Sequence, residues 1–429
     1  MKNSNSAGLS IGVALLPIIF LVLLLSINVF IYGDDSLNGT NQFILILSGL
    51  FGASIGFIYK VSYKKILTSI SNSVKSVTGA LLILLFVGAL AGTWMISGII
   101  PAMVYYGLKI LDPNIFLPAC IVICSIISVA TGSSWTTSAT VGIALVGIGK
   151  ALGIPAGMVG GAVIAGAYFG DKLSPLSDTT NLAAAVTKVD LFRHIKYLTY
   201  TTIPSISITL IVFIILGFMQ VSDGSTDNTY LLSAITEKFN ITLILFSVPI
   251  LVLIMIIKKT PPLIALVIGT LVGAVFAIIF QPQIISELSS GSYSKLTSTY
   301  VVIMDTITGP ISIETNNVIL NDLFSTGGML GMMNTIFLVI GTMVFGGVME
   351  ATGLLYRISS SIIQYAESTG SVIATTTCTC LFFNVTVSDQ YLSIVVPGRM
   401  YADTFRAVSY THLRAHETEA DLVCRLLLE

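Results

Sequence analysis

The stretch Ile-Gly-Val-Ala-Leu-Leu-Pro-Ile-Ile-Phe-Leu-Val-Leu-Leu-Leu-Ser-Ile-Asn-Val-Phe-Ile, residues 11–31, decides the fold class. It is apolar for 21 residues and is interrupted only by Pro17, Ser26 and Asn28. About 20 apolar residues suffice for a helix to cross a bilayer. A secretory signal has a shorter apolar region followed by a small-residue cleavage site, which this stretch lacks. We therefore predict that residues 11–31 form the first membrane-spanning helix.

The whole chain has the composition of a membrane protein. Of its 429 residues, 54% are hydrophobic and only 10% are charged, whereas soluble domains carry about 25% charged residues. The net charge of −1 gives no electrostatic reason to expect a nucleic-acid partner. Five cysteines are scattered along the chain, and Cys120 and Cys124 have no histidines near them. We expect apolar packing residues here rather than a metal site or a disulfide framework.

Seven more apolar stretches predict further spanning helices. They are Phe43–Tyr59, Ala80–Ile100, Leu198–Met219, Ile241–Ile257, Leu263–Phe280, Thr335–Met349 and Ser371–Val387. Two longer stretches, Phe116–Ile148 and Ala156–Val186, are interrupted by polar clusters. One of these crosses the membrane and the other is a re-entrant hairpin, and the sequence does not decide which. The predicted fold is an all-α polytopic membrane protein with about ten or more transmembrane helices, some of them broken or re-entrant.

Basic residues orient the predicted spans. Three clusters are expected to lie on one side of the membrane, namely Lys60, Lys64, Lys65 and Lys75, then Lys188, Arg193 and Lys196, then Lys258 and Lys259. Asp34 and Asp35 lie in the first loop on the other side. Because cytoplasmic loops are rich in lysine and arginine, we predict a cytoplasmic N-terminus and a location in the cell (inner, cytoplasmic) membrane.

The sequence Gly-Ala-Tyr-Phe-Gly-Asp-Lys-Leu-Ser-Pro-Leu-Ser-Asp-Thr-Thr-Asn, residues 166–181, places charges and hydroxyls between apolar stretches. A charge near the bilayer centre costs about 3 kcal/mol on insertion scales, so such residues usually mark an ion or substrate path. Gly170 and Pro175 favour a break in the helix, and a broken helix frees carbonyls that bind hard cations such as sodium. The alternative is a polar cytoplasmic loop that ends the helix.

Four consecutive residues of this segment are predicted to form the cation site, namely Asp178, Thr179, Thr180 and Asn181. They offer carboxylate, hydroxyl and amide oxygens, which suit a hard cation. The expected direct ligands of Na⁺ are Asp178, Thr179 and Asn181.

Two further carboxylates, Asp171 and Asp389, are predicted to carry protons or to gate the path. Sodium and a proton can compete for one such carboxylate, and exchange of the two ions then follows. Asp389 belongs to the cluster Asn-Val-Thr-Val-Ser-Asp-Gln, residues 384–390. The alternative for Asp389 is a polar residue at the end of a helix.

Residues from three clusters are expected to line the path. They are Ser133, Ser134, Thr136, Lys172, Ser174 and Asn384. The first three belong to Thr-Gly-Ser-Ser-Trp-Thr-Thr-Ser, residues 131–138, which has six hydroxyls and a glycine that permits local unwinding. The alternative is that these hydroxyls bond to their own helix and bend it.

Identities at a spacing of 249 residues indicate two pseudo-symmetric halves, about residues 8–220 and 240–407, within one transmembrane domain of residues 1–407. Gly92-Thr93 recurs as Gly341-Thr342, and Gly98 recurs as Gly347. Residues 408–429 are unusually charged and resemble a translated sequencing adapter, so we expect a non-native tail. The natural protein is then expected to continue beyond Ala407, and the second half is incomplete.

The motifs resemble those of the NhaC-type sodium/proton antiporter family, within the broader ion-transporter superfamily, over most of residues 8–407. The most specific one is Gly-Asp-Lys-Leu-Ser-Pro-Leu-Ser-Asp-Thr-Thr-Asn-Leu, residues 170–182, supported by residues 131–136 and 388–399. The resemblance implies exchange of sodium for protons, although some relatives exchange malate and lactate. The family's late Ser-Pro-Leu…Pro-Trp-Asn-Thr motif is absent from this sequence.

We therefore predict a secondary antiporter, not an enzyme, that exchanges Na⁺ for H⁺ by alternating access. The alternatives are an organic-acid antiporter of the malate/lactate type, or a sodium-coupled carboxylate transporter, in which Lys172 or Arg399 would be essential. An intramembrane enzyme would need a nucleophile–base pair or a metal site, and the sequence offers neither. No cofactor is expected. The expected partners are the lipid bilayer, Na⁺ and H⁺, and a homo-oligomer is compatible with the sequence.

Overall fold

The computed structural model describes residues 9–110, 113–175, 177–187, 189–220, 228–258, 260–289, 294–315, 320–321, 324–363, 369–387, 393–394, 397–398 and 401. These residues form helices, apart from connections and the two-residue strands β1 (Ile311–Ser312) and β2 (Ser325–Thr326). The chain divides into two compact units, each assembled from separate segments.

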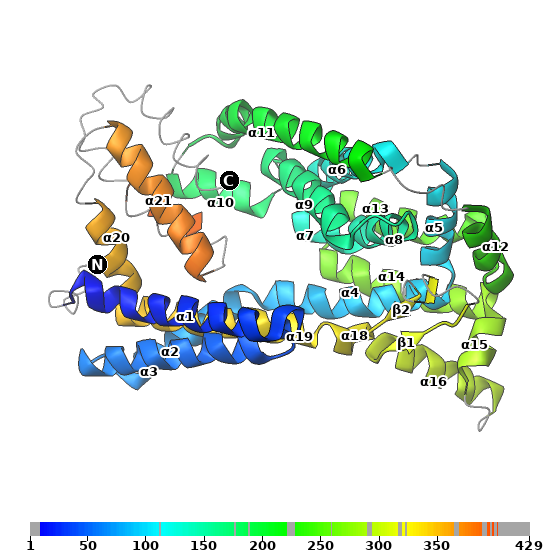
Figure 1. Cartoon of the computed structure of the whole chain (residues 1–429), viewed down its shortest axis with the longest axis horizontal. Coiled ribbons are helices and arrows are strands. Elements are labelled where there is room, and N and C mark those ends of the chain that lie inside the picture. The colour runs from blue at the N-terminus through cyan, green and yellow to red at the C-terminus, as the bar shows by residue number, and fades with distance from the viewer. Residues whose placement is uncertain are drawn as a thin grey trace. The chain divides into compact units, whose positions relative to one another are not determined.

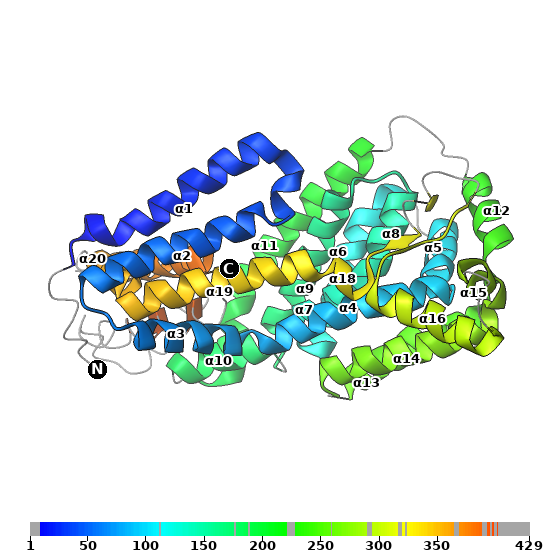
Figure 2. The ribbon, with the colours of Figure 1, turned by 90° about the horizontal axis from the view of Figure 1, so that it is seen from below.

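Unit 1 comprises residues 1–81, 179–199 and 334–429. Its helices are α1 (Ile11–Tyr32), α2 (Thr40–Ile58), α3 (Tyr63–Ser76), nearly all of α10 (Asp178–Thr187), nearly all of α19 (Met333–Thr352), α20 (Leu354–Ile363) and α21 (Thr369–Val387). Figure 2 shows α1, α2 and α19 side by side. Gly49, Gly52 and Gly56 of α2 contact α19 and so allow a close approach of the two helices.

Unit 2 comprises residues 82–178 and 200–333. It contains most of α4 (Thr78–Ile96) and of α11 (Leu191–Gln220), with α5 (Ile99–Ile110), α6 (Pro113–Thr131), α7 (Ser134–Thr137), the π-helical segment Ser138–Gly142, α8 (Ile143–Ala151), α9 (Ala156–Leu173), α12 (Asn228–Lys238), α13 (Ser247–Ile257), α14 (Pro262–Phe280), α15 (Pro282–Leu288), α16 (Lys295–Thr308) and α18 (Gly328–Gly331). Figure 1 shows α6 to α9 gathered together. One hydrophobic core joins α4, α6, α9 and α14.

Seven helices of the described part are long and apolar enough to cross a membrane, namely α1, α2, α4, α6, α11, α14 and α19. An eighth candidate is a broken pair, residues 231–238 and 243–256, bent by 86°. The all-α polytopic prediction is therefore confirmed. The predicted number of ten or more is reached only if shorter or more polar helical segments such as α9 and α21 are also counted.

The predicted span Ala80–Ile100 is wrong at its end, because α4 stops at Ile96 and Gly98 breaks the helix with φ +80°. The predicted span Ile241–Ile257 starts differently too, since a short 3₁₀ turn, Leu243–Phe246, precedes α13. Periodicity and hydropathy do not detect such breaks, because the flanking residues stay apolar.

Helix boundaries repeat along the chain, but not in the predicted register of 249. Thr78, which begins α4, precedes the start of α19 at Met333 by 255 residues, and Thr131, which ends α6, precedes the end of α21 at Val387 by 256. Gly98 therefore corresponds to Gly353, which also breaks a helix, with φ +79°. The register of 249 is wrong because it pairs Gly98 with Gly347, which lies inside α19.

Candidate functional site

Helix α6 breaks inside the polar cluster of residues 131–138. It ends at Thr131, and Gly132 has φ +68°, a left-handed conformation that suits glycine. The chain restarts as a helix after Ser133, whose Oγ accepts the backbone N–H of Thr136 at 3.2 Å. The new helix then widens into one π-helical segment, a feature common at functional sites.

The break makes a helical hairpin. Phe116 of α6 contacts the position of Gly149 of α8, and the Oγ1 atoms of Thr131 and Thr137 are 3.4 Å apart. Contacts of rising residue number on one leg with falling number on the other define antiparallel helices. Of the two topologies left open by the sequence, the structure supports the one in which Phe116–Ile148 is the hairpin.

Helix α9 packs against α6 in the same direction. A Cβ atom at Gly166 would collide with the carbonyl oxygen of Ile121, and one at Gly170 with that of Ser125. Ser128 Oγ donates to Ala167 O at 2.5 Å, and a stripe of small residues of this kind allows close packing in lipid. The end of α9 therefore reaches the tip of the hairpin.

An oxygen-rich cluster forms where the hairpin tip and the end of α9 meet. Ser134 Oγ donates to Asp171 Oδ2 at 3.2 Å, and Ser174 Oγ donates to Val129 O at 2.8 Å. Asp171 is only 5% exposed, and Ser134, Thr136, Thr137 and Ser174 are also buried. A carboxylate among hydroxyls and helix-end carbonyls is a suitable ligand set for a hard cation.

Comparison with known proteins places the chain in a family. A family model described as the Na⁺/H⁺ antiporter family matches residues 166–418. The chain belongs to the Na⁺/H⁺ antiporter family. The matched range contains all of the segment 166–181, and it also reaches residues 408–418, the start of the tail predicted to be non-native. That prediction concerns residues outside the described ones and stays a prediction.

Three relatives carry different names within this Na⁺/H⁺ antiporter family. The malate-2H⁺/Na⁺-lactate antiporter of Bacillus subtilis (strain 168) is 36% identical over 389 residues, covering 90% of this chain and 79% of the relative. The Na⁺/H⁺ antiporter NhaC of Alkalihalophilus pseudofirmus is 33% identical over 377 residues (88% and 79%). The arginine/ornithine antiporter ArcD of Halobacterium salinarum is 33% identical over 399 residues (92% and 78%). The family is one of transporters, and this chain is a multi-pass membrane protein.

The structure brings together one predicted carboxylate and most of the predicted path residues. Asp171 lies with Ser133, Ser134, Thr136 and Ser174 at the hairpin tip. Lys172 is the next residue of α9 and is half-buried. The path-lining role of these residues stays a prediction.

The predicted cation ligands are placed less completely. Thr179 and Thr180 are buried in the first turn of α10, whereas the Asn181 side chain is exposed. The Asp178 side chain and the whole of Asp389 lie outside the described residues, and Asn384 is exposed on α21. The proposed sodium ligands Asp178, Thr179 and Asn181 therefore stay a prediction.

Some residues of the cluster were not predicted individually. Ser128 and the carbonyl of Val129 connect α6 to α9. Thr137 reaches Thr131 across the tip. The sequence signal for Ser128 was weak, because a single serine in an apolar helix usually bonds to its own backbone.

Proposed function

We propose that this protein is a secondary antiporter that exchanges Na⁺ for H⁺ across the cell membrane by alternating access, with its N-terminus in the cytoplasm. The observation that carries the proposal is the buried carboxylate of Asp171 beside the hydroxyls of a broken helix hairpin. The similarity to a relative named as a Na⁺/H⁺ antiporter supports the choice of ions.

Competition between the two ions at Asp171 would produce the exchange. A buried carboxylate with neither a proton nor a cation beside it is costly in a low-dielectric interior. Asp171 is therefore stable either protonated or with sodium held by Ser134 and neighbouring oxygens. Alternation of access between the two sides then moves one ion against the other.

Asp178, Thr179, Thr180 and Asn181 follow the same segment, and we propose that they complete or extend the sodium path. Asp389 is proposed as a second carboxylate from the other half of the chain. These assignments rest on residue chemistry and motif resemblance.

The test is sodium-dependent proton movement in everted membrane vesicles that contain the full-length protein and a pH-sensitive dye. We expect sodium to collapse a preformed proton gradient in the wild type. Asp171→Asn should abolish this response at equal protein level, because an amide neither binds nor releases a proton in this range. The matched control is Asp305→Asn, which changes an exposed aspartate of α16 in the same unit. Normal sodium response of Asp171→Asn would overturn the assigned site.

Organic-acid exchange is the second candidate function. It is favoured by the 36% identity to a relative named as a malate-2H⁺/Na⁺-lactate antiporter. In the same vesicles, a response that needs malate and lactate together with sodium would identify this function. Lys172 and Arg399 would then be the first residues to substitute, as candidates to bind a carboxylate substrate.

A further inference from the structure

A pocket of about 540 Å³ lies in unit 1 beside the end of α19. The helices α2 and α19 end at the same level, because Thr352 packs directly on Gly56. Helix α3 starts there, and Ser62 Oγ accepts the backbone N–H of Lys65 at 3.4 Å. Since α2 and α19 are both candidate spans, the pocket is at the boundary where hydrocarbon gives way to lipid headgroups.

The polar face of α3 is fixed toward this pocket by packing on the other face. Ile66 is only 3% exposed, and the backbone of Ile70 lies against Gly347 of α19. Lys65, Ser69 and Asn72 follow at helical spacings of four and three, so they share the opposite face. The pocket is therefore held open by the fold rather than formed by loose side chains.

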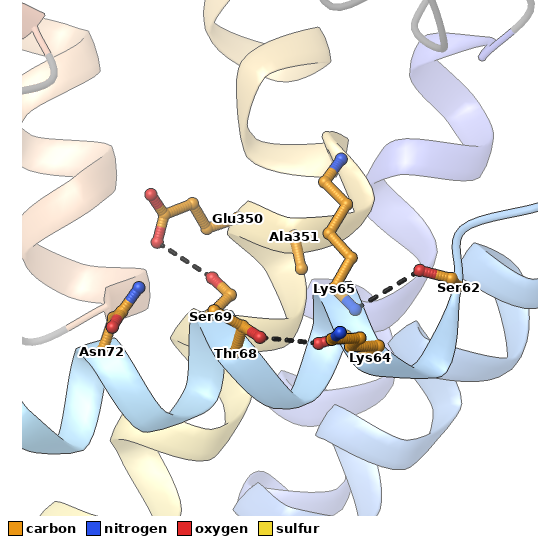
Figure 3. A pocket seen from close by; sticks show the side chains of 8 residues that line it. All are labelled: Ser62, Lys64, Lys65, Thr68, Ser69, Asn72, Glu350 and Ala351. Carbon is orange, nitrogen blue, oxygen red and sulfur yellow. Dashed lines mark hydrogen bonds between the residues drawn. The ribbon is translucent and has the colours of Figure 1, made fainter.

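Charges of both signs line the pocket without neutralising each other. Figure 3 shows Lys65 and Glu350 extending to the same side of α3, one on each side of Ala351. Ser69 Oγ donates to Glu350 Oε2 at 3.3 Å and orients that carboxylate. Within the described part of the chain, Lys65 and Glu350 have no oppositely charged side chain at ion-pair distance. A ligand with both charges can thus fill the gap.

We propose that this pocket binds the headgroup of a zwitterionic phospholipid, a phosphoethanolamine group. The phosphate would accept hydrogen bonds from Lys65 and Lys64, and the ammonium group would donate to Glu350. The volume lies within the range of small-molecule sites, about 300–1,000 Å³. Basic pockets at the ends of spans are suited to lipid phosphates, and Glu350 adds a preference for a cationic neighbour of that phosphate. This inference does not depend on which ions the protein transports.

Binding is measured by native mass spectrometry of the full-length protein in detergent, titrated with phosphatidylethanolamine or with phosphatidylglycerol. We expect phosphatidylethanolamine to bind more tightly. Lys65→Gln and Glu350→Gln should each weaken its binding by about tenfold, which is about 1.4 kcal/mol. Lys75→Gln is the matched control, because Lys75 is an exposed lysine of the same helix outside the pocket.

Other outcomes would overturn the proposal in distinct ways. Tighter binding of phosphatidylglycerol, with Glu350→Gln strengthening it, would mean a site for anions only. Displacement of the lipid by millimolar soluble phosphoethanolamine at equal affinity would mean a site for a soluble phosphate compound. Equal binding by all variants would mean that the lipids bind elsewhere. Size-exclusion profiles identical to wild type confirm that each variant is folded.

Discussion

At the scale of single residues, the bond from Ser134 to Asp171 offers the sharpest test of the site. Hydrogen bonds to charged groups contribute about 1.5–3 kcal/mol. We therefore expect Ser134→Ala to raise the sodium concentration for half-maximal exchange about tenfold or more. Ser134→Thr, which keeps the hydroxyl, should recover much of this affinity. The measurement is the sodium dependence of dye response in everted vesicles.

A control for this experiment comes from α11. Ser207 bonds only to Ile203 O of its own helix, and its side chain is exposed. Ser207→Ala should leave the sodium dependence unchanged. If Ser134→Ala also left it unchanged, Ser134 would have no part in binding the ion.

The sequence identified Asp171 because a carboxylate between apolar stretches is conspicuous. It could not rank Asp171 against Asp178, since both lie in one polar segment and the contact with Ser134 joins residues 37 positions apart. Ser128 was missed for a related reason. Its bond to Ala167 depends on how α6 packs on α9, and hydropathy carries no information on that packing.

At the scale of helices, Gly170 controls the contact between α6 and α9. A methyl group there would meet the backbone of Ser125 and Val129, which cannot move aside easily. Overpacking of this kind costs about 1–3 kcal/mol. We expect Gly170→Ala to lower the thermal unfolding midpoint in detergent by several degrees. Gly157→Ala, on the same helix with open space around it, should change it little.

Two glycines of α19 and its end should differ in the origin of their effects. Gly347→Ala would press on the backbone of Ile70, whereas Gly353 has open space but φ +79°. The strain at Gly353 should cost about 1–2 kcal/mol, and the steric clash at Gly347 should cost more. Thermal unfolding of both variants checks this order. A larger loss for Gly353→Ala would contradict the contact between α3 and α19.

Most helices could be predicted from the sequence, because apolar stretches of about 20 residues have few alternatives. The breaks were harder. Gly132 was flagged by its polar neighbours, and the structure confirms the break there. Gly98 was not flagged, because apolar residues follow it directly. Its left-handed conformation follows from tertiary packing, which places Gln281 against it.

At the scale of the whole molecule, the orientation in the membrane can be tested directly. We expect Asn38→Cys, after α1, to react with an impermeant thiol reagent in intact cells, on a background without the five native cysteines. Lys64→Cys, at the start of α3, should react only in everted vesicles. The reverse labelling pattern would place the N-terminus outside.

The sequence suggested two halves along the chain, whereas the structure groups helices from both halves in each unit. Unit 1 combines α1 to α3 with α19 to α21, and unit 2 combines most of α4 and α5 to α9 with α12 to α16. Weak identities could indicate a repeat, but four matches could not fix its register. The register came from the positive φ angles of Gly98 and Gly353, which only the three-dimensional structure provides.

This grouping has a consequence for biosynthesis. During translation α1, α2 and α3 leave the ribosome first, yet the helix that covers Gly49, Gly52 and Gly56 is made nearly 300 residues later. The early helices must therefore wait in the bilayer with their small-residue face covered only by lipid or by insertion machinery. A nascent chain arrested before α19 should remain sensitive to protease in this region, and completion of α19 should protect it.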